Sequence, residues 1–368
     1  MTDDKINRES NFELLRLFCI LFVIILHYNG LIFNTLEFTK NASFINKYFI
    51  RIGESLCVCA VNVFLIITGY FLSKKNKVNI RKIINIFSVL IIFDLSSYLI
   101  RIFFGISAFK IKSLISCIAP MNYYAFLYSA VFLLSPFLNL VVKLENKKFN
   151  NFMIIIVILF SVFPTVIDFI SNYFHSINSA GRSFVSGDGN GGGYTLVNFI
   201  LLYYIGAFIK KNNCSFSINK SLIGYICSTL FILIGMKINT NHMFDYCNIF
   251  VISQGFFLFI IFKNIAIKSK IINYLAKSVW GMFIIHFAVM ECIKKYIDIE
   301  LVCNADFLHL FVTSFLVIFC SFAVSMILDI ILRFVMISLC ILFNKISILN
   351  KEIQINSDLE ENNDSSII

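Results

Sequence analysis

Long apolar runs separated by short polar segments dominate the chain. Ten of these runs are long enough to cross the roughly 30 Å hydrocarbon layer of a bilayer as α-helices. They lie near residues 12–32, 52–72, 83–104, 124–142, 152–171, 195–209, 219–236, 248–265, 275–293 and 307–331. Two of them are short, and the last apolar stretch continues to about Phe343, so totals of nine or eleven spans also fit the sequence. The pattern predicts an all-α, polytopic membrane protein.

The loops between the runs differ in their content of lysine and arginine. One set of alternate loops contains fifteen of these residues: Lys74, Lys75, Lys77, Arg81, Lys82, Lys143, Lys147, Lys148, Lys210, Lys211, Lys220, Lys263, Lys268, Lys270 and Lys277. The other set contains nine, spread over longer loops: Lys40, Lys47, Arg51, Lys110, Lys112, Arg182, Lys237, Lys294 and Lys295. Cytoplasmic loops carry the excess of positive charge in membrane proteins. We therefore predict that the first set is cytoplasmic and, with an even number of spans, that both termini are too.

The predicted membrane domain covers residues 12–347 and is flanked by two polar tails. Residues 1–11 form the N-terminal tail, and residues 348–368 form a C-terminal tail that we expect to be disordered. The longest outer loop, about 172–194, contains the sequence SGDGNGGGY. Glycine-rich loops can cradle phosphates, but no Lys-Ser/Thr pair follows this one, so we expect a flexible loop.

Composition excludes several classes of protein. Hydrophobic residues make up 59% of the chain and charged residues 14%, whereas soluble domains have about 25% charged residues. The net charge of +10 could indicate nucleic acid, but the positive residues sit between apolar runs and form no basic face with interleaved aromatics. We therefore predict membrane lipids and no nucleic acid as partners. Heavy use of Ile, Asn, Lys and Phe indicates an AT-rich bacterial genome. We expect a multi-pass protein of the bacterial plasma membrane.

The 11 cysteines are scattered through apolar stretches, as Cys19, Cys227 and Cys320 illustrate. They resemble small buried hydrophobic residues rather than a disulfide framework. Cys57 and Cys59 are too close together for ordinary metal-ligand spacing, and no CxxC or HExxH motif is present. We predict no bound metal and no permanently bound cofactor.

The first run contains two ionisable residues, Arg16 and His27, in the sequence NFELLRLFCILFVIILHY. Ionisable side chains inside a span are costly and are functional candidates by default. Their separation corresponds to about 20° beyond three full helical turns and to about 16 Å along the axis. Both side chains therefore face the same way, with Arg16 near the cytoplasmic surface and His27 deep in the membrane.

Two interpretations of this pair remain open. In one, Arg16 holds a phosphate-bearing group at the cytoplasmic mouth, and His27 acts further in as a base or nucleophile. In the other, Arg16 pairs with Glu13 and anchors the helix at the membrane surface, while His27 forms a hydrogen bond to another helix. Spacing alone does not separate the two interpretations.

Three segments carry a resemblance to a known family. LLRLFCILFVIILH has Arg, ten residues and His in the first span, NVFLIITGYFLSKK ends the second span with Thr-Gly-Tyr, and AKSVWGMFIIH is a late span ending in Ile-His. In this order they resemble the membrane-bound acyltransferase type 3 family. APMNYYAFLYSAVFLLSPFLN and LVNFILLYYIGAFIKK resemble the middle of surface-polysaccharide O-acetyltransferases in that family. The similarity covers roughly residues 12–332.

The resemblance implies transfer of an acyl group, usually acetyl from acetyl-CoA in the cytoplasm, to a hydroxyl of a surface polysaccharide or lipid-linked glycan. It matches Arg16 to the donor-side basic residue and His27 to the catalytic histidine. His286 matches the late Ile-His signature and is a second candidate for proton handling. Glu37 falls where some members have an essential acid, although a solvated loop carboxylate is an equally good interpretation.

The remaining candidates are less clearly marked. Many family members have two basic residues three positions apart at the start of the third span, where this chain has Arg81 and Lys82 with Ile84 and Asn85 three positions further on. We expect Arg81 and Lys82 to contribute to donor binding. Candidates for lining a cavity are Asp94, Asp168 and Asp329, and histidines expected to be solvated are His175, His242 and His309.

A second class of protein fits the same composition, namely a flippase or exporter of lipid-linked sugars or polysaccharide. Such a protein is equally polytopic and also carries charge inside the membrane. It has no need for Arg16 and His27 in line on one helix face, whereas a transferase with a cytosolic donor does. The sequence identifies neither the acceptor sugar, nor the acyl group, nor the oligomeric state.

The predicted topology can be tested with reporter fusions at two positions. A fusion after Asn146 should report a cytoplasmic location, because this position lies in a lysine-rich loop. A fusion after Gly189, in the glycine-rich loop, should report an external location. The same location at both positions would contradict the span assignment.

Overall fold

α-Helices dominate the described part of the chain, which comprises residues 9–174, 192–237, 242–343 and 352–354 of a computed structural model. In order, the helices are α1 (Ser10–Asn29), α2 (Thr35–Phe38), η1 (Thr39–Asn41), α3 (Phe44–Cys57), α4 (Ala60–Leu72), α5 (Arg81–Phe103), α6 (Ile111–Ile118), α7 (Tyr123–Lys143), α8 (Asn146–Val157), η2 (Ile158–Val162), α9 (Phe163–Phe174), α11 (Leu196–Lys211), α12 (Ile218–Gly235), α13 (Ile249–Lys263), α14 (Lys270–Leu275), η4 (Ala276–Ser278), α15 (Val279–Lys294), α16 (Ile299–Asn304) and α17 (Phe307–Phe343). Two three-residue strands, β1 (Lys77–Asn79) and β2 (Glu352–Gln354), pair antiparallel with Val78 opposite Ile353. The predicted all-α fold class is confirmed.

Eight helical segments of the described chain are long and apolar enough to cross a membrane. They are Ser10–Asn29, Phe44–Leu72, Arg81–Phe103, Ile111–Lys143, Asn146–Ile170, Ile218–Gly235, Lys270–Lys294 and Phe307–Phe334. The remaining two predicted runs coincide with α13, a shorter apolar helix, and with the 16-residue α11. The polytopic membrane fold is therefore confirmed, while the exact number of crossings stays a prediction.

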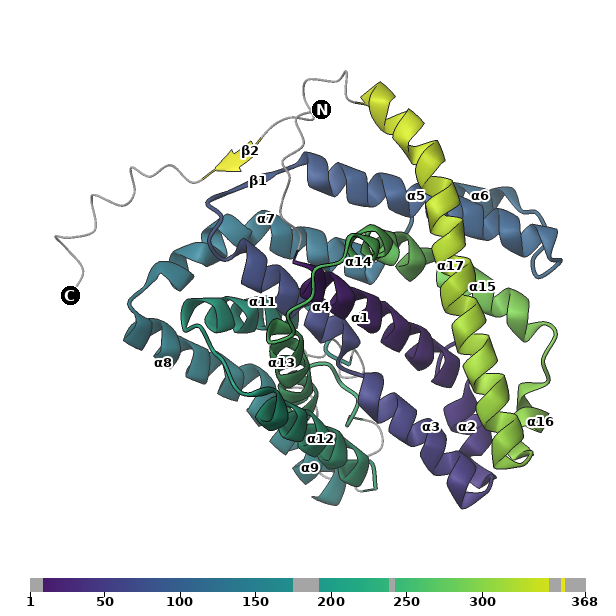
Figure 1. Ribbon diagram of the computed structural model, residues 1–368, viewed down its shortest axis with the longest axis horizontal. Helices are drawn as coiled ribbons and strands as arrows, with labels where there is room; N and C mark the ends of the chain where they lie inside the picture. The colour runs from purple at the N-terminus through teal and green to yellow at the C-terminus, as the bar shows by residue number, and fades with distance from the viewer. Residues whose placement is uncertain (1–8, 175–191, 238–241, 344–351, 355–368) are drawn as a thin grey trace.

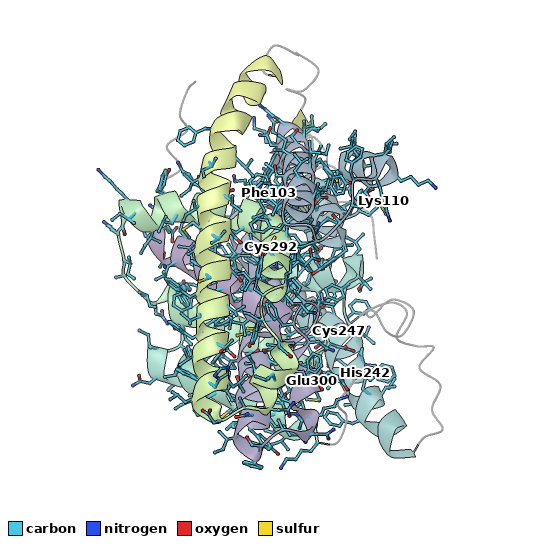
Figure 2. All side chains as sticks on the ribbon, turned by 90° about the vertical axis from the view of Figure 1, so that its right-hand side faces the viewer. Phe103, Lys110, His242, Cys247, Cys292 and Glu300 are labelled. Carbon is cyan, nitrogen blue, oxygen red and sulfur yellow. The ribbon has the colours of Figure 1, made fainter. Side chains whose placement is uncertain are left out.

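Helix α1 packs against α3, α4, α13, α14, α15 and α17 (Figure 1). Tyr28, near the end of α1, is hydrogen-bonded to Ser314 at the beginning of α17 (2.8 Å). At the other end, Ser10 accepts a hydrogen bond from Ser269 just before α14, and Arg333, late in α17, donates to the nearby Ser278. Helices α1 and α17 therefore run antiparallel, and α17 extends along the near face of the molecule in Figure 2. Such an arrangement is required for both termini to lie on one side, although the side itself stays a prediction.

The second predicted span is interrupted, since the helix stops after Cys57 and resumes as α4. The last carbonyl groups of a helix have no partner within it and must find one elsewhere. Gln254 of α13 donates to the carbonyl of Ser55 (2.8 Å), and the Tyr225 hydroxyl of α12 donates to that of Leu56 (2.5 Å). Non-helical backbone is tolerated at membrane depth where protein groups satisfy it in this way.

Helices α4 and α11 cross at two glycines. A Cβ atom at Gly69 would lie 1.9 Å from the carbonyl oxygen of Tyr203, and one at Gly206 would lie 2.1 Å from that of Ile66. Small residues allow membrane helices to approach this closely, which increases van der Waals contact between them. The crossing therefore depends on both positions lacking a side chain.

Replacing either Gly69 or Gly206 by Ala should lower stability by more than about 1–3 kcal/mol, because the two backbones must separate. Gly255→Ala is the matched control, since a Cβ there would lie 3.5 Å from its nearest neighbours. Thermal unfolding of the purified, detergent-solubilised variants measures the difference. Equal stability of Gly69→Ala and Gly255→Ala would show that α4 and α11 do not approach as described.

Candidate active site

Two histidines from distant parts of the chain meet inside the helical bundle. His27 lies in the last turn of α1, His286 lies midway along α15, and Nδ1 of His27 is 2.6 Å from Nε2 of His286. The other ring nitrogen of His286, Nδ1, lies 2.9 Å from the carbonyl oxygen of Met282. His286 is fully buried, whereas His27 is partly exposed. The structure therefore brings together two of the residues singled out from the sequence.

The two imidazole rings lie edge to edge. Their planes are within 6° of each other, and their centroids are 4.9 Å apart. The centroid separation exceeds the nitrogen–nitrogen distance by about the width of one imidazole ring, that is, half a ring on each side. This sum is expected when both ring centres lie on the line of the hydrogen bond, so the two rings share a plane. The Phe287 ring packs at an angle against both, 4.4 Å from the centroid of His27 and 4.9 Å from that of His286. Packing and the hydrogen bond together restrict the orientation of both rings.

Helix α15, which carries His286, is held by a charge-assisted hydrogen bond near its start and by an ion pair near its end. Near its start, Arg333 of α17 bonds to both Asp329 and Ser278. Near its end, Glu291 pairs with Arg101 of α5. Charge-assisted hydrogen bonds are short and directional, so they fix the position of the helix along its axis. Asp329, a candidate for lining a cavity, is engaged in this ion pair.

Arg16 lies on the same face of α1 as His27, at the opposite end of the helix. Its guanidinium is 2.6 Å from Glu13, and the two side chains are 33% and 6% exposed. This ion pair is the one that the anchoring interpretation predicts. The charge of Arg16 also acts on the hydroxyl groups of Tyr124 and Tyr128 of α7. Arg16 therefore lies within electrostatic range of a second helix in addition to its ion pair with Glu13.

The basic residues at the start of α5 differ in their surroundings. Lys82 donates a hydrogen bond to the Tyr128 hydroxyl (2.9 Å) and lies 4.4 Å from the centroid of the Phe132 ring. The backbone N–H of Arg81 donates to the Asn79 side chain, which starts the helix. Tyr128 is hydrogen-bonded to Lys82 and lies within electrostatic range of Arg16, and we call these three residues the inner cationic cluster.

A family model described as an acyltransferase domain matches residues 9–330. The chain belongs to the acyltransferase 3 family. The match extends from the start of α1 into α17 and includes the inner cationic cluster and both histidines. No curated protein and no solved structure shows significant similarity to the chain. The resemblance noted in the sequence is confirmed, and the protein is a membrane acyltransferase.

Glu37 of this acyltransferase lies in α2 and pairs with Lys40 at 2.6 Å, with both side chains 56% exposed. This arrangement is typical of a solvated carboxylate. A buried carboxylate near the end of α1 is Glu54 of α3, which accepts a hydrogen bond from Asn29 (3.0 Å). Sequence reasoning passed over Glu54, although it is an ionisable residue inside the second predicted run.

Tyr128 was also passed over, since tyrosine is common in apolar runs near membrane surfaces. The available signal was the spacing of Tyr124 and Tyr128, which places two hydroxyl groups on one face of the predicted fourth helix. An aromatic hydroxyl beside a cation marks a polar position in an otherwise apolar helix. The spacing identifies a helix face, but it does not identify Lys82 as the hydrogen-bond partner of Tyr128.

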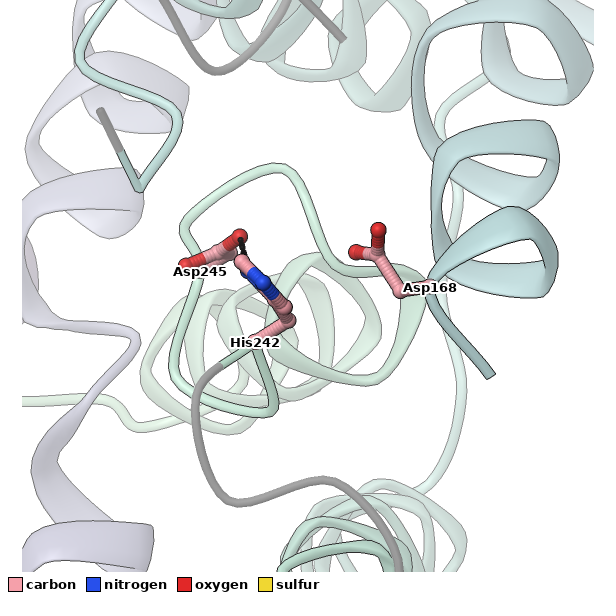
Figure 3. Close-up of side chains that lie close together, drawn as sticks. All are labelled: Asp168, His242 and Asp245. Carbon is pink, nitrogen blue, oxygen red and sulfur yellow. Dashed lines mark hydrogen bonds and ion pairs between the residues drawn. The ribbon is translucent and has the colours of Figure 1, made fainter. Parts of the chain in front are cut away.

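Three side chains of the acyltransferase could hold a metal ion (Figure 3). They are Asp168 of α9 with His242 and Asp245 of the segment before α13, and their ligand atoms all lie within 4.8 Å of one another. An imidazole with two carboxylates suits Zn²⁺ or Mn²⁺. The prediction of no bound metal did not consider this cluster, in which Asp168 is far in sequence from His242 and Asp245, and it stays a prediction.

The expectation that His242 is solvated is wrong, because its side chain is only 20% exposed and Nδ1 lies 3.0 Å from Asp245. The local reason is the turn before α13, which brings the imidazole back over the carboxylate three residues later. His309 is exposed, as expected. His175 and most of the glycine-rich loop lie outside the described residues, as do most residues of both tails.

Proposed function

We propose that this acyltransferase moves an acyl group, in the simplest case acetyl, from cytoplasmic acyl-CoA to a hydroxyl of a cell-surface polysaccharide or lipid-linked glycan in a bacterial plasma membrane. The observation that carries the proposal is the line of Arg16 and His27 on one face of α1, with His27 hydrogen-bonded to His286. Membership of the acyltransferase 3 family supports the same class of reaction.

The donor end of the proposed site is the inner cationic cluster. Acyl-CoA carries phosphates at one end and its thioester at the other, separated by the pantetheine arm. Arg16 and Lys82 supply positive charge for the phosphates, and Tyr128 holds the Lys82 ammonium in place. The axial separation of about 16 Å between Arg16 and His27 suits a donor that reaches inward along α1. Arg81 is close enough along the chain to add charge at the same mouth.

His27 then handles the proton of the reaction. In direct transfer, its free ring nitrogen takes the proton of the acceptor hydroxyl as the oxygen bonds to the thioester carbon. The carbon–sulfur bond breaks, and the thiolate takes the proton from the imidazolium to give the CoA thiol. In the alternative, the ring nitrogen attacks the thioester carbon, the carbon–sulfur bond breaks, and CoA leaves as the thiolate. The acceptor oxygen then bonds to the acyl carbon, the carbon–nitrogen bond breaks, and the hydroxyl proton passes to the thiolate to give the CoA thiol. Both routes use the same nitrogen of the same residue.

An exporter of lipid-linked sugars is not favoured, because the chain belongs to an acyltransferase family. The proposal also assigns no catalytic task to Glu37, whose carboxylate is exposed and paired with Lys40.

Replacing His27 by Ala should reduce acyl transfer by about 10²- to 10⁴-fold, the range that a positioned acid–base group contributes. His309→Ala, which removes an exposed imidazole, should leave activity unchanged. The measurement is mass spectrometry of surface glycans from cells with equal membrane levels of each variant. Near-normal glycan acylation in the His27→Ala strain would show that His27 is structural.

Replacing Arg16 by Gln should weaken acyl-CoA binding roughly 10- to 150-fold, because a charge-assisted contact is worth about 1.5–3 kcal/mol. Arg16→Lys should recover part of the loss, since the charge remains but the fork geometry is gone. His27→Ala should leave donor binding nearly intact. Lys40→Gln, which removes an exposed cation beyond the other end of α1, is the matched control.

Affinities of these Arg16 variants are measured on purified, detergent-solubilised protein over a range of salt concentrations. Screening by salt weakens binding that depends on exposed charge, so the difference between wild type and Arg16→Gln should shrink as salt increases. Unchanged donor affinity in Arg16→Gln would favour the anchoring interpretation, in which the Glu13 ion pair is the whole role of Arg16.

A further inference from the structure

The hydrogen bonds of the histidine pair determine which ring nitrogens carry protons. The carbonyl oxygen of Met282 can only accept a hydrogen bond, so Nδ1 of His286, 2.9 Å away, must be the donor. A neutral imidazole has one donor and one acceptor nitrogen, and Nε2 of His286 is therefore the acceptor. Nδ1 of His27 lies 2.6 Å from that acceptor and must donate to it. This leaves Nε2 of His27 without a proton.

We propose that His286 is a positioning residue, which holds His27 in the Nδ1–H tautomer with the lone pair of Nε2 available to the reacting groups. The use of that lone pair in acyl transfer rests on the proposed function. The tautomer itself is a property of the resting protein and does not depend on any substrate.

Burial supports this direction of the hydrogen bonds. The reverse direction would have Nε2 of His286 donate to His27 while Nδ1 still donates to Met282, so that His286 would be an imidazolium cation. Its hydrogen-bond partners among the described residues are a neutral ring and backbone carbonyls, and its side chain is fully buried. An ionised group in such surroundings, with no carboxylate bonded to it, carries a large desolvation cost. The state in which both imidazole rings are neutral, with His27 donating to His286 and His286 donating to Met282, is therefore favoured.

The partial exposure of His27 fits the same assignment. Of the two histidines, only His27 is partly exposed, whereas His286 is fully buried. When Nε2 of His27 takes a proton, its Nδ1–H remains bonded to His286, so the ring does not need to turn during the reaction. A carboxylate plays this orienting part for the histidine of serine-hydrolase triads. Here a neutral imidazole, itself fixed by a backbone carbonyl, takes that position.

The tautomer can be measured directly, because the chain contains only 5 histidines. Nitrogen-15 NMR of histidine-labelled protein in detergent distinguishes protonated from unprotonated ring nitrogens, and the His27→Ala and His286→Gln variants assign the two signals. We expect wild-type His27 to be Nδ1–H with an unprotonated Nε2. An Nε2–H tautomer of His27 in the wild type would overturn the proposal.

Two substitutions of His286 separate positioning from packing. His286→Leu removes the acceptor, so His27 should change to a tautomer mixture rich in Nε2–H, and kcat should fall at least about 100-fold with little change in acyl-CoA affinity. His286→Gln keeps a carbonyl acceptor for the Nδ1–H of His27, so it should restore the tautomer and at least about tenfold of the lost kcat. His309→Ala is the control for loss of an exposed imidazole.

The outcomes distinguish this inference from the proposed function. Loss of activity in His286→Leu with an unchanged His27 tautomer would show that His286 only fills space, which overturns the proposal. Activity equal to wild type in His286→Leu would also overturn it. Wild-type protein that shows the expected tautomers but transfers no acyl group would refute the proposed function and leave the tautomer assignment standing.

Discussion

Polar groups inside the hydrocarbon layer have no water to bond with, so each must find its partner within the protein. The break between α3 and α4 persists because Gln254 and Tyr225 bond to the carbonyls that it leaves open. The two histidines obey the same rule, because His286 is satisfied by Met282 on one side and by His27 on the other. One ring nitrogen of His27 is left to react, at the partly exposed edge of the chain of hydrogen bonds.

The constraint also explains why the charges are divided along α1. Arg16, toward the start of the helix, is paired with Glu13, whereas the same face carries at the other end of the helix a histidine, which can be neutral. The ion pair does not exclude a ligand, because a guanidinium has five N–H donors and the Glu13 contact occupies one nitrogen. Anchoring the helix and binding a phosphate are therefore compatible roles for Arg16.

The long apolar runs predicted the helices well, because length and apolarity are local properties that the bilayer itself demands. The face shared by Arg16 and His27 was also predictable, because regular helix geometry fixes the relative direction of two residues on one helix. Contacts between distant segments were not, since nothing in the sequence states that His27 meets His286 or that Lys82 meets Tyr128. The Asp168–His242–Asp245 cluster was missed because α9 and the turn before α13 are distant in sequence and come together only in the folded protein. Likewise, the second run gave no sign of its break, which depends on side chains of α12 and α13.

The central claim is that a donor enters beside Arg16 and reacts at His27. The most direct test is an experimental structure of the protein in a lipid nanodisc with a non-hydrolysable acyl-CoA analogue. The account predicts the phosphates within ion-pair distance of Arg16 and Lys82, the pantetheine arm along α1, and the carbonyl mimic within hydrogen-bond distance of Nε2 of His27. Phosphates bound at the Glu37 end of α1, or an acyl group that does not reach His27, would contradict it.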